Sequence, residues 1–163
     1  MSALVVRVST AADANEIRRL RLEALQDAPA AYGTRYEEVV EWSEAQWLEM
    51  ATSPTSFVVF LDGQMVGIAR GGTHDGEAGS TNRWLWGMYV TPAARGTGAV
   101  QELIGAVADW SRADGGTALC LYVSTAAPRA RALYEKVGFV ATGLEFDHDT
   151  RPELRFSEMR MAL

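Results

Sequence analysis

The sequence predicts an α+β fold that is built on one mixed β-sheet. Short runs of β-branched and aromatic residues alternate with amphipathic stretches along the chain. In the first half, Asp62-Gly63 joins two such runs as a two-residue hairpin turn. In the second half the order becomes strand, helix, strand, helix, which is typical of parallel neighbours. We therefore expect a sheet that is antiparallel in its first half and parallel in its second half.

Two elements open the chain. A strand covers residues 4–8, and a helix follows with Asp13 as its N-cap and Glu16 completing a capping box. The apolar stripe of this helix consists of Ile17, Leu20, Leu22 and Leu25, and its outer face carries Arg18, Arg19 and Arg21. Pro29 predicts that the helix ends near Gln26, because the residue before a proline avoids the helical conformation.

A second helix is predicted from the capping box at residues 43–46 to the stop signal at residues 53–54. Its apolar side is expected to consist of Trp42, Trp47, Leu48 and Met50. The expected elements that follow are strands over 57–61 and 64–70, a polar glycine-rich loop over 71–81 and a buried strand over 84–90.

The second half contains two further helices. The first covers residues 98–114, and its apolar residues Val100, Leu103, Ile104 and Val107 follow helical spacing. A strand over 118–123 separates it from the second helix, which Pro128 opens and Gly138 ends. Strands over 139–143 and 154–161 complete the fold.

Composition limits the classes of protein. The length fits one domain over residues 1–163, and a chain of this size needs no metal or disulfide to fold, so we expect no metal site. Cys120 is the one cysteine, which excludes an intrachain disulfide. No apolar run reaches ~18 residues and no signal peptide is visible, so we expect a cytoplasmic protein without a membrane partner.

The net charge of −6 argues against a nucleic acid partner, because an acidic protein binds polyanions poorly. A cationic small molecule is compatible with the negative electrostatic field of such a protein. The same charge also simply keeps a domain soluble, so it does not identify a ligand.

The segment between the strand at 84–90 and the next helix has the features of an anion site. Gly96 and Gly98 carry no side chain where the backbone must approach a ligand, and the amides that open a helix point outward to an anion. Arg95 adds a charged donor. The alternative is that the two glycines only make a tight turn.

Two known phosphate motifs do not fit this segment. A P-loop needs Gly-Lys-Ser/Thr, whereas Ala99 and Val100 follow Gly98. A dinucleotide fingerprint needs a third glycine where Gln101 stands, and an acid after the next strand where Ser124 stands. A nucleotide-binding domain of either type is therefore disfavoured.

The segment does resemble the acyl-CoA motif of the GNAT superfamily of N-acetyltransferases. That motif is Arg/Gln-x-x-Gly-x-Gly/Ala after a strand ending in Val-x-Pro; here Val90-Thr91-Pro92 precedes Arg95–Val100, and Val100 stands where the family has Gly or Ala. The family motif Leu-Tyr-x-x-x-Gly-Phe is similar to residues 133–139. Ala127 occupies the position of a family asparagine that contacts the pantetheine arm.

The resemblance implies a three-layer α/β/α fold with a centrally splayed sheet. It also implies transfer of an acetyl group from acetyl-CoA, as co-substrate, to a primary amine of a small molecule or peptide, by direct attack in a ternary complex. Relatives often dimerise, so the resemblance also allows a homodimer. The cofactor-binding residues carried over are Met88, Tyr89, Val90, Arg95, Gly96, Thr97, Gly98, Ala99 and Val100.

By the same resemblance, Tyr134 is the catalytic acid that protonates the thiolate, although its spacing also fits a core residue. Many relatives place a glutamate base on the strand where this chain has Trp84 or Trp86. Base candidates in the preceding loop are His74, Asp75 and Glu77, although a solvated loop residue is the favoured interpretation of each. A chain of waters, or selection of the small fraction of free amine, is the alternative.

The acceptor amine is expected near the first two helices and the loop between them. The predicted substrate-binding residues are Tyr32, Glu37 and Trp86, and Glu38 and Trp42 would add to an aromatic and acidic lining. An ordinary amphipathic surface is the alternative. The missing strand carboxylate and Ala127 keep a second function open, namely a non-catalytic acyl-CoA sensor or interaction module with the same fold.

Overall fold

The computed structural model describes residues 3–74 and 76–163, and in these residues the strands form one sheet in the order β1-β2-β3-β4-β5-β7-β6. The strands are β1 Leu4–Val8, β2 Ser56–Leu61, β3 Gln64–Gly72, β4 Asn82–Val90, β5 Ala118–Ser124, β6 Val140–Asp147 and β7 Arg155–Ala162. The α-helices are α1 Ala14–Asp27, α2 Tyr36–Val39, α3 Glu44–Thr52, α4 Ala99–Ala113 and α5 Pro128–Val137.

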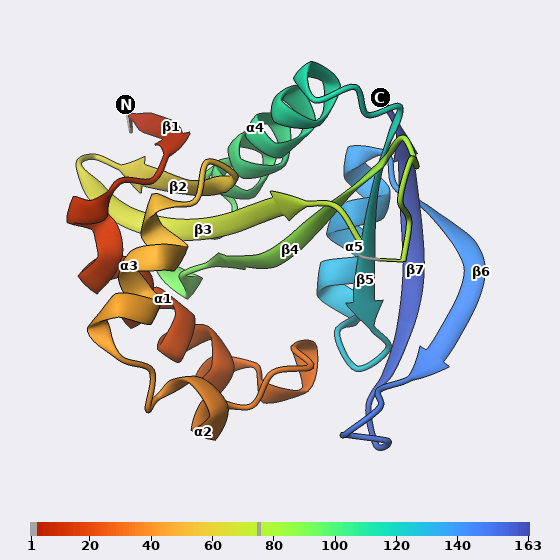
Figure 1. Ribbon diagram of the computed structural model, residues 1–163, viewed down its shortest axis with the longest axis horizontal. Helices are drawn as coiled ribbons and strands as arrows, with labels where there is room; N and C mark the ends of the chain where they lie inside the picture. The colour runs from red at the N-terminus through yellow and green to blue at the C-terminus, as the bar shows by residue number, and fades with distance from the viewer. Residues whose placement is uncertain (1–2, 75) are drawn as a thin grey trace.

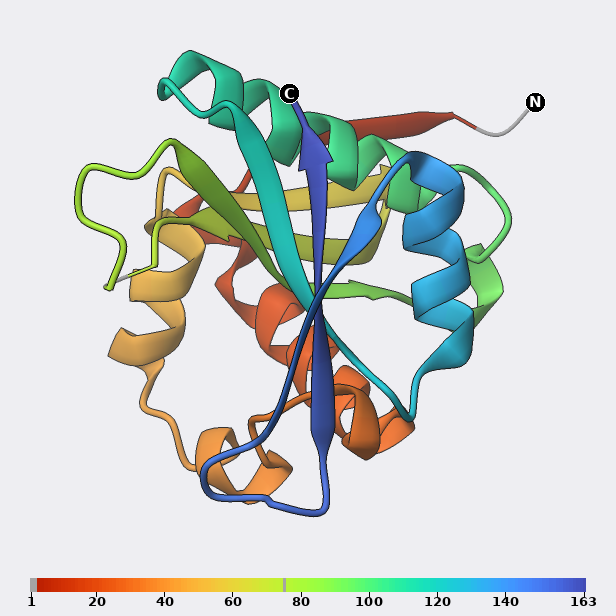
Figure 2. The same cartoon turned by 90° about the vertical axis from the view of Figure 1, so that its right-hand side faces the viewer.

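Helices cover both faces of the sheet, which confirms the three-layer prediction (Figure 1). On one face, Ile17 and Leu20 of α1 pack with Val58, Ile68 and Tyr89 of the sheet. On the other face the core is built around α4, whose buried residues include Leu103, Ile104 and Val107. Figure 2 shows α5 on this second side, next to β5. Burial of apolar side chains in both layers fixes the positions of the strands between them.

The centre of the sheet is splayed, as the resemblance implied. β4 and β5 are parallel, but their register covers only Asn82–Trp84 against Ala118–Cys120, after which the two strands part. A bulge lies on the same stretch of β4: Ile68 pairs with Tyr89 and Arg70 with Trp86, so one residue of β3 opposes two residues of β4. Gly87 allows this bulge because its φ of 61° is a conformation that glycine tolerates. β4 therefore has an open backbone edge beyond Trp84.

The direction of the later strands differs from the sequence prediction. Among the strands that the structure describes, only β4 and β5 are parallel neighbours, because β7 enters between β5 and β6 and is antiparallel to both. The strand–helix–strand pattern correctly indicated the first crossover. The prediction of a parallel second half was wrong beyond β5, since the last two strands form a hairpin-like pair.

Local signals were correct at several turns and wrong at one cap. Ser43 Oγ accepts from the Gln46 amide at 3.3 Å, which confirms the capping box of α3. Asp62 and Gly63 both have positive φ, 50° and 85°, as a type I′ hairpin requires. Asp13, in contrast, makes no side-chain cap to α1, because its carboxylate accepts from the Thr10 amide and forms an ion pair with Arg7 at 2.7 Å.

Two helix side chains lie on a different face from the one predicted. Leu48 was expected on the apolar side of α3 but is 45% exposed. Arg21 was expected on the outer face of α1, but its guanidinium points into a cavity beside the sheet. No helix in the described part of the chain has the length and apolar character needed to cross a membrane.

Candidate active site

A cavity of about 710 Å³ opens where β4 and β5 part. Its wall joins segments that are distant in sequence, namely α1, the loop after α1, the β4 bulge, the end of β5, the first turns of α5 and the turn between β6 and β7. Hydrogen bonds hold two of these segments together, since Arg151 donates to the Tyr32 carbonyl at 2.9 Å and Arg35 donates to the Thr150 carbonyl at 3.3 Å. The splay therefore supplies a chamber that reaches both faces of the sheet.

The β4 bulge forms one side of this cavity. Gly87 and Met88 line it, and the Tyr32 hydroxyl donates to the Met88 carbonyl at 2.7 Å. Burial raises the pKa of Tyr32 to about 12, so this phenol keeps its proton at neutral pH. The hydrogen bond fixes the loop after α1 against the bulge.

The backbone of Val90 faces the open edge of β4. The Thr91 amide donates to the Val66 carbonyl of β3 at 2.8 Å, and alternate residues of a strand turn their backbone groups to opposite edges. The amide and carbonyl of Val90 therefore point away from β3, to the side that β5 leaves open. They are in position to pair with an extended ligand.

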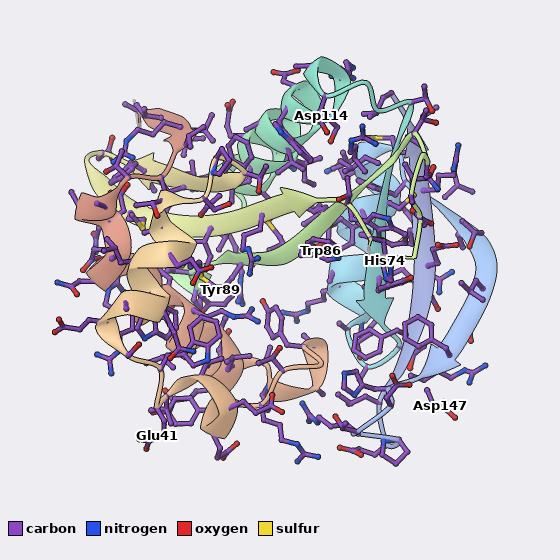
Figure 3. The ribbon with its side chains drawn as sticks, viewed as in Figure 1. Glu41, His74, Trp86, Tyr89, Asp114 and Asp147 are labelled. Carbon is purple, nitrogen blue, oxygen red and sulfur yellow. The ribbon has the colours of Figure 1, made fainter. Side chains whose placement is uncertain are left out.

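The side chain of Tyr89 points away from this edge. Figure 3 shows Tyr89 on the side of β4 that α1 and α3 cover, and its hydroxyl donates to Glu23 at 2.8 Å. Burial and the neighbouring Glu23 raise the pKa of Tyr89 above its usual value. A ligand on the open edge would thus meet the backbone of this strand rather than the Tyr89 ring.

Tyr134 faces the cavity from α5. Its helix begins at Pro128 and ends at Gly138, whose φ of 127° stops the helical path. The ring is buried against Phe139, with 5.6 Å between ring centroids. Burial raises the pKa of Tyr134 above the usual value for a phenol, so the hydroxyl stays protonated well into the alkaline range.

The loop before α4 has the geometry of an anion site. Gly96 and Gly98 adopt φ of 80° and 94°, which is accessible to glycine at little cost. Within the described residues, the amides of Gly96, Gly98, Ala99 and Val100 donate to no backbone carbonyl. The Thr97 hydroxyl donates instead to the Ala94 carbonyl, which closes the turn. Val100 packs on the α4 core and so does not cover these amides.

Arg95 is half-exposed and forms an ion pair with Asp27, the last residue of α1, at 3.0 Å. Its guanidinium is therefore near the loop but already has an acidic partner. An anion at the helix start would compete with Asp27 for this charge.

The acceptor residues predicted from sequence divide into two groups. Tyr32, Trp86 and Glu38 line the cavity, and Figure 3 shows Trp86 where β4 and β5 part. Glu37 is exposed and lies outside the lining. Trp42 packs on Trp47, with 4.8 Å between ring centroids, at a second hollow between α1 and α3.

Two of the loop candidates for a base, His74 and Glu77, do not line the cavity. Glu77 accepts from the indole of Trp84 at 3.0 Å, which gives its carboxylate a structural role. His74 is exposed and packs in a tilted arrangement on the Trp84 ring, with 5.4 Å between centroids. Asp75 lies outside the described residues.

Comparison with protein families shows which family the chain belongs to. Residues 15–139 match the model of the acetyltransferase (GNAT) family, which is more than three quarters of the chain. The chain belongs to the GNAT family. It is therefore an acyltransferase with acetyl-CoA as its co-substrate, as the two motifs predicted.

Solved structures support the same fold for this acetyltransferase. A GCN5-related N-acetyltransferase from Kribbella flavida is 24% identical, with 99% of this chain and 98% of that chain covered and a TM-score of 0.79. A GNAT-family acetyltransferase from Streptococcus pneumoniae is 20% identical, with 99% of both chains covered and a TM-score of 0.78.

A third similar structure is yncA, a putative acetyltransferase from Salmonella typhimurium solved with acetyl-CoA. It is 20% identical, with 99% of this chain and 94% of that chain covered and a TM-score of 0.73. No curated protein matches the sequence.

Sequence reasoning missed several residues that line the cavity of this acetyltransferase, namely Arg21, Arg70, Tyr122, His148 and Asp149. A local signal existed for Arg21, because residues 17, 20, 21, 24 and 25 follow one helical stripe and four of them are buried and apolar. No local pattern indicated His148, which reaches the site through the turn between β6 and β7.

Proposed function

We propose that one domain over residues 1–163 transfers the acetyl group of acetyl-CoA to a primary amine of a small molecule or peptide. The observation that carries this proposal is the single cavity that brings the open edge of β4, Tyr134 and the loop after α1 together. A thioester, an amine and a proton donor all fit within it. The acceptor and the details of the mechanism are proposals about this chain.

The cofactor is held at two places in this proposal. The amides of residues 96–100 and the guanidinium of Arg95 bind the diphosphate, since a helix start with free amides favours an anion. The pantetheine arm pairs with the backbone of Met88 and Val90, the residues on either side of Tyr89, as an added strand. An amide of this stretch also polarises the thioester carbonyl.

The reaction proceeds by direct attack in a ternary complex. The amine nitrogen forms a bond with the carbonyl carbon, the carbon–sulfur bond breaks, and the thiolate takes the proton of the Tyr134 hydroxyl. The nitrogen loses its own proton to water that leads out of the cavity, because the described lining has no carboxylate on β4, and water returns a proton to the Tyr134 oxygen once the products have left. The raised pKa of Tyr134 suits this role, since the acid must be protonated when the thiolate leaves.

The decisive experiment incubates the protein with acetyl-CoA and a panel of amines, and follows thiol release together with acetylated product by mass spectrometry. Release of thiol with stoichiometric acetylation of an amine supports the transferase. Tight acetyl-CoA binding with no acetylation across amino acids, polyamines and peptides would favour the sensor function instead. Absence of acetyl-CoA binding would contradict both.

A further inference from the structure

We propose that the acceptor of this enzyme carries an anionic oxygen group, a carboxylate in the simplest case, that Arg21 and Arg70 bind in the cavity. The inference rests on the proposed acetyl transfer and names the class of its acceptor. The sequence analysis expected an acidic lining around Glu37 and Glu38. The structure adds two arginines, Arg21 and Arg70, to a lining that also contains Glu38 and Asp149.

Arg21 lies inside the site with an unused hydrogen-bond donor. Its Nη1 atom is buried and, among the described residues, donates to no acceptor of the protein. A Cβ built on Gly87 would have this atom as its nearest neighbour, at 3.8 Å, so the guanidinium lies beside the bulge. Buried donors without acceptors are costly, which makes an acceptor atom on the bound substrate a natural partner.

Tyr32 holds the Arg21 guanidinium in place. The Cζ atom of Arg21 lies 5.3 Å from the centroid of the Tyr32 ring, in cation–π geometry. The Tyr32 hydroxyl is itself fixed on the Met88 carbonyl. The fork of Arg21 is therefore oriented before any ligand binds, as bidentate recognition of a carboxylate requires.

Arg70 adds a second positive charge to the same wall. It lies on β3, directly opposite Trp86 in the register, and its side chain lines the cavity with that of Arg21. Neither arginine forms an ion pair with a carboxylate in the part of the chain that the structure describes. Burial, together with a smaller effect of the like charge of Arg70, lowers the pKa of Arg21, while Tyr32 opposes this shift. A bound anion would relieve this repulsion.

The remaining charged groups of the lining leave this assignment intact. Glu38 accepts from the Arg35 amide at 2.7 Å, and Asp149 lies in the turn between β6 and β7. His148 Nδ1 accepts from the Thr150 amide at 3.3 Å, so its other ring nitrogen is a donor. That nitrogen lies against Gly33 and adds a donor to the wall.

The test compares matched acceptors. Amino carboxylates of increasing chain length are assayed against their uncharged amides and against aminoalkyl phosphates, in wild type, Arg21→Gln, Arg70→Gln and the control Arg18→Gln. Arg18 is exposed on the same helix and lies outside the cavity. We expect kcat/KM for an anionic acceptor to exceed that for its amide by about tenfold or more. The phosphate arm identifies which oxyanion is preferred.

We expect Arg21→Gln to lower kcat/KM for the anionic acceptor by about 10- to 100-fold and to leave the amide within about threefold. Arg70→Gln should reduce the same preference, and Arg18→Gln should retain it. Equal losses for both acceptors in Arg21→Gln would overturn the inference, because they would place Arg21 on the thioester carbonyl instead. Equal use of both acceptors by wild type would also overturn it while acetyl transfer itself stands.

A binding measurement keeps the inference separate from turnover. An N-acetylated amino carboxylate and its amide are titrated calorimetrically into the protein with CoA present. Binding of the carboxylate about tenfold or more tighter, lost in Arg21→Gln, supports the anionic subsite. Equal affinities, or no binding of the carboxylate, would overturn it.

Discussion

Two phenols of the cavity have different chemical roles because of their partners. Tyr32 has committed its proton to the Met88 carbonyl, where it fixes the loop after α1. Tyr134 enters from the opposite side on α5, beside the carboxyl end of β5. Burial keeps both phenols protonated, and in the proposed mechanism only Tyr134 gives its proton to the leaving group. A single hydroxyl therefore bears the proposed acid chemistry.

Removing that hydroxyl should slow chemistry without harming cofactor binding. We expect Tyr134→Phe to lower kcat by about a hundredfold, since general acid catalysis contributes 10²–10⁴-fold, and to change KM for acetyl-CoA less than about threefold. Steady-state kinetics measures both. Tyr122→Phe is the matched control, because Tyr122 also lines the cavity but its ring contacts Trp84 and Phe146. Undiminished turnover in Tyr134→Phe would exclude its role as the acid.

The pH dependence should follow the acceptor rather than Tyr134. A group with a raised pKa stays protonated as pH rises, so the acid form of Tyr134 persists above the ordinary phenol pKa of about 10. We expect kcat/KM to rise with the free-amine fraction of the acceptor. We expect no fall in kcat/KM below pH 10. A profile with acceptors of different amine pKa checks this. A falling limb centred below pH 10 with every acceptor would contradict the assignment.

In the proposed function, cofactor affinity depends on the start of α4. Gly98 combines a φ of 94° with the N-cap position, and a side chain at that φ costs about 1–3 kcal/mol. We expect Gly98→Ala to raise KM for acetyl-CoA about tenfold and to leave kcat within about threefold, because the loop binds but does not react. Kinetics with varied acetyl-CoA measures the split.

Gly105 in the same helix gives the matched control. A Cβ there meets nothing within 4 Å, and alanine stabilises a helix interior by about 0.5–1 kcal/mol relative to glycine. Gly105→Ala should therefore raise the unfolding midpoint and leave KM unchanged. If both variants change KM alike, the loop has no special part in cofactor binding.

Sequence signals predicted elements well where the deciding contacts are local. Ser43 and Gln46 cap α3 as predicted, because they are three residues apart and need no other partner. Asp13 failed as a cap because Arg7, from the strand before it, takes its carboxylate. The motif around Tyr134 identified a residue that does line the cavity, whereas Arg21 was misplaced on the outer face although its spacing put it on the apolar stripe.

Contacts across the whole molecule could not be predicted in this way. The acceptor wall depends on the turn between β6 and β7 meeting the loop after α1, through Arg35 with Thr150 and Arg151 with Tyr32. These partners are more than 100 residues apart in the chain. Their encounter follows from β7 lying between β5 and β6, and that strand order was the part of the sheet the sequence did not indicate.

At the scale of the whole molecule, co-substrate binding should stabilise the fold. A ligand that binds only the folded state adds about 2.7 kcal/mol at a hundred times its Kd. For a chain of this length that corresponds to a rise in Tm of roughly 5–10 °C. Thermal unfolding at increasing acetyl-CoA measures the rise, and Gly98→Ala should need more ligand for the same effect. An unchanged Tm at saturation would mean that the cofactor does not bind the folded state selectively.

The short register between β4 and β5 links the stability of the fold to the supply of acetyl-CoA. Three residue pairs join the two halves of the sheet directly, and beyond them the added strand of the proposal would be the co-substrate itself. Resistance of the protein to unfolding and to proteolysis would then vary with the supply of the metabolite that it consumes. Such an enzyme resists unfolding and proteolysis best when its co-substrate is abundant, and is degraded most readily when its co-substrate is scarce.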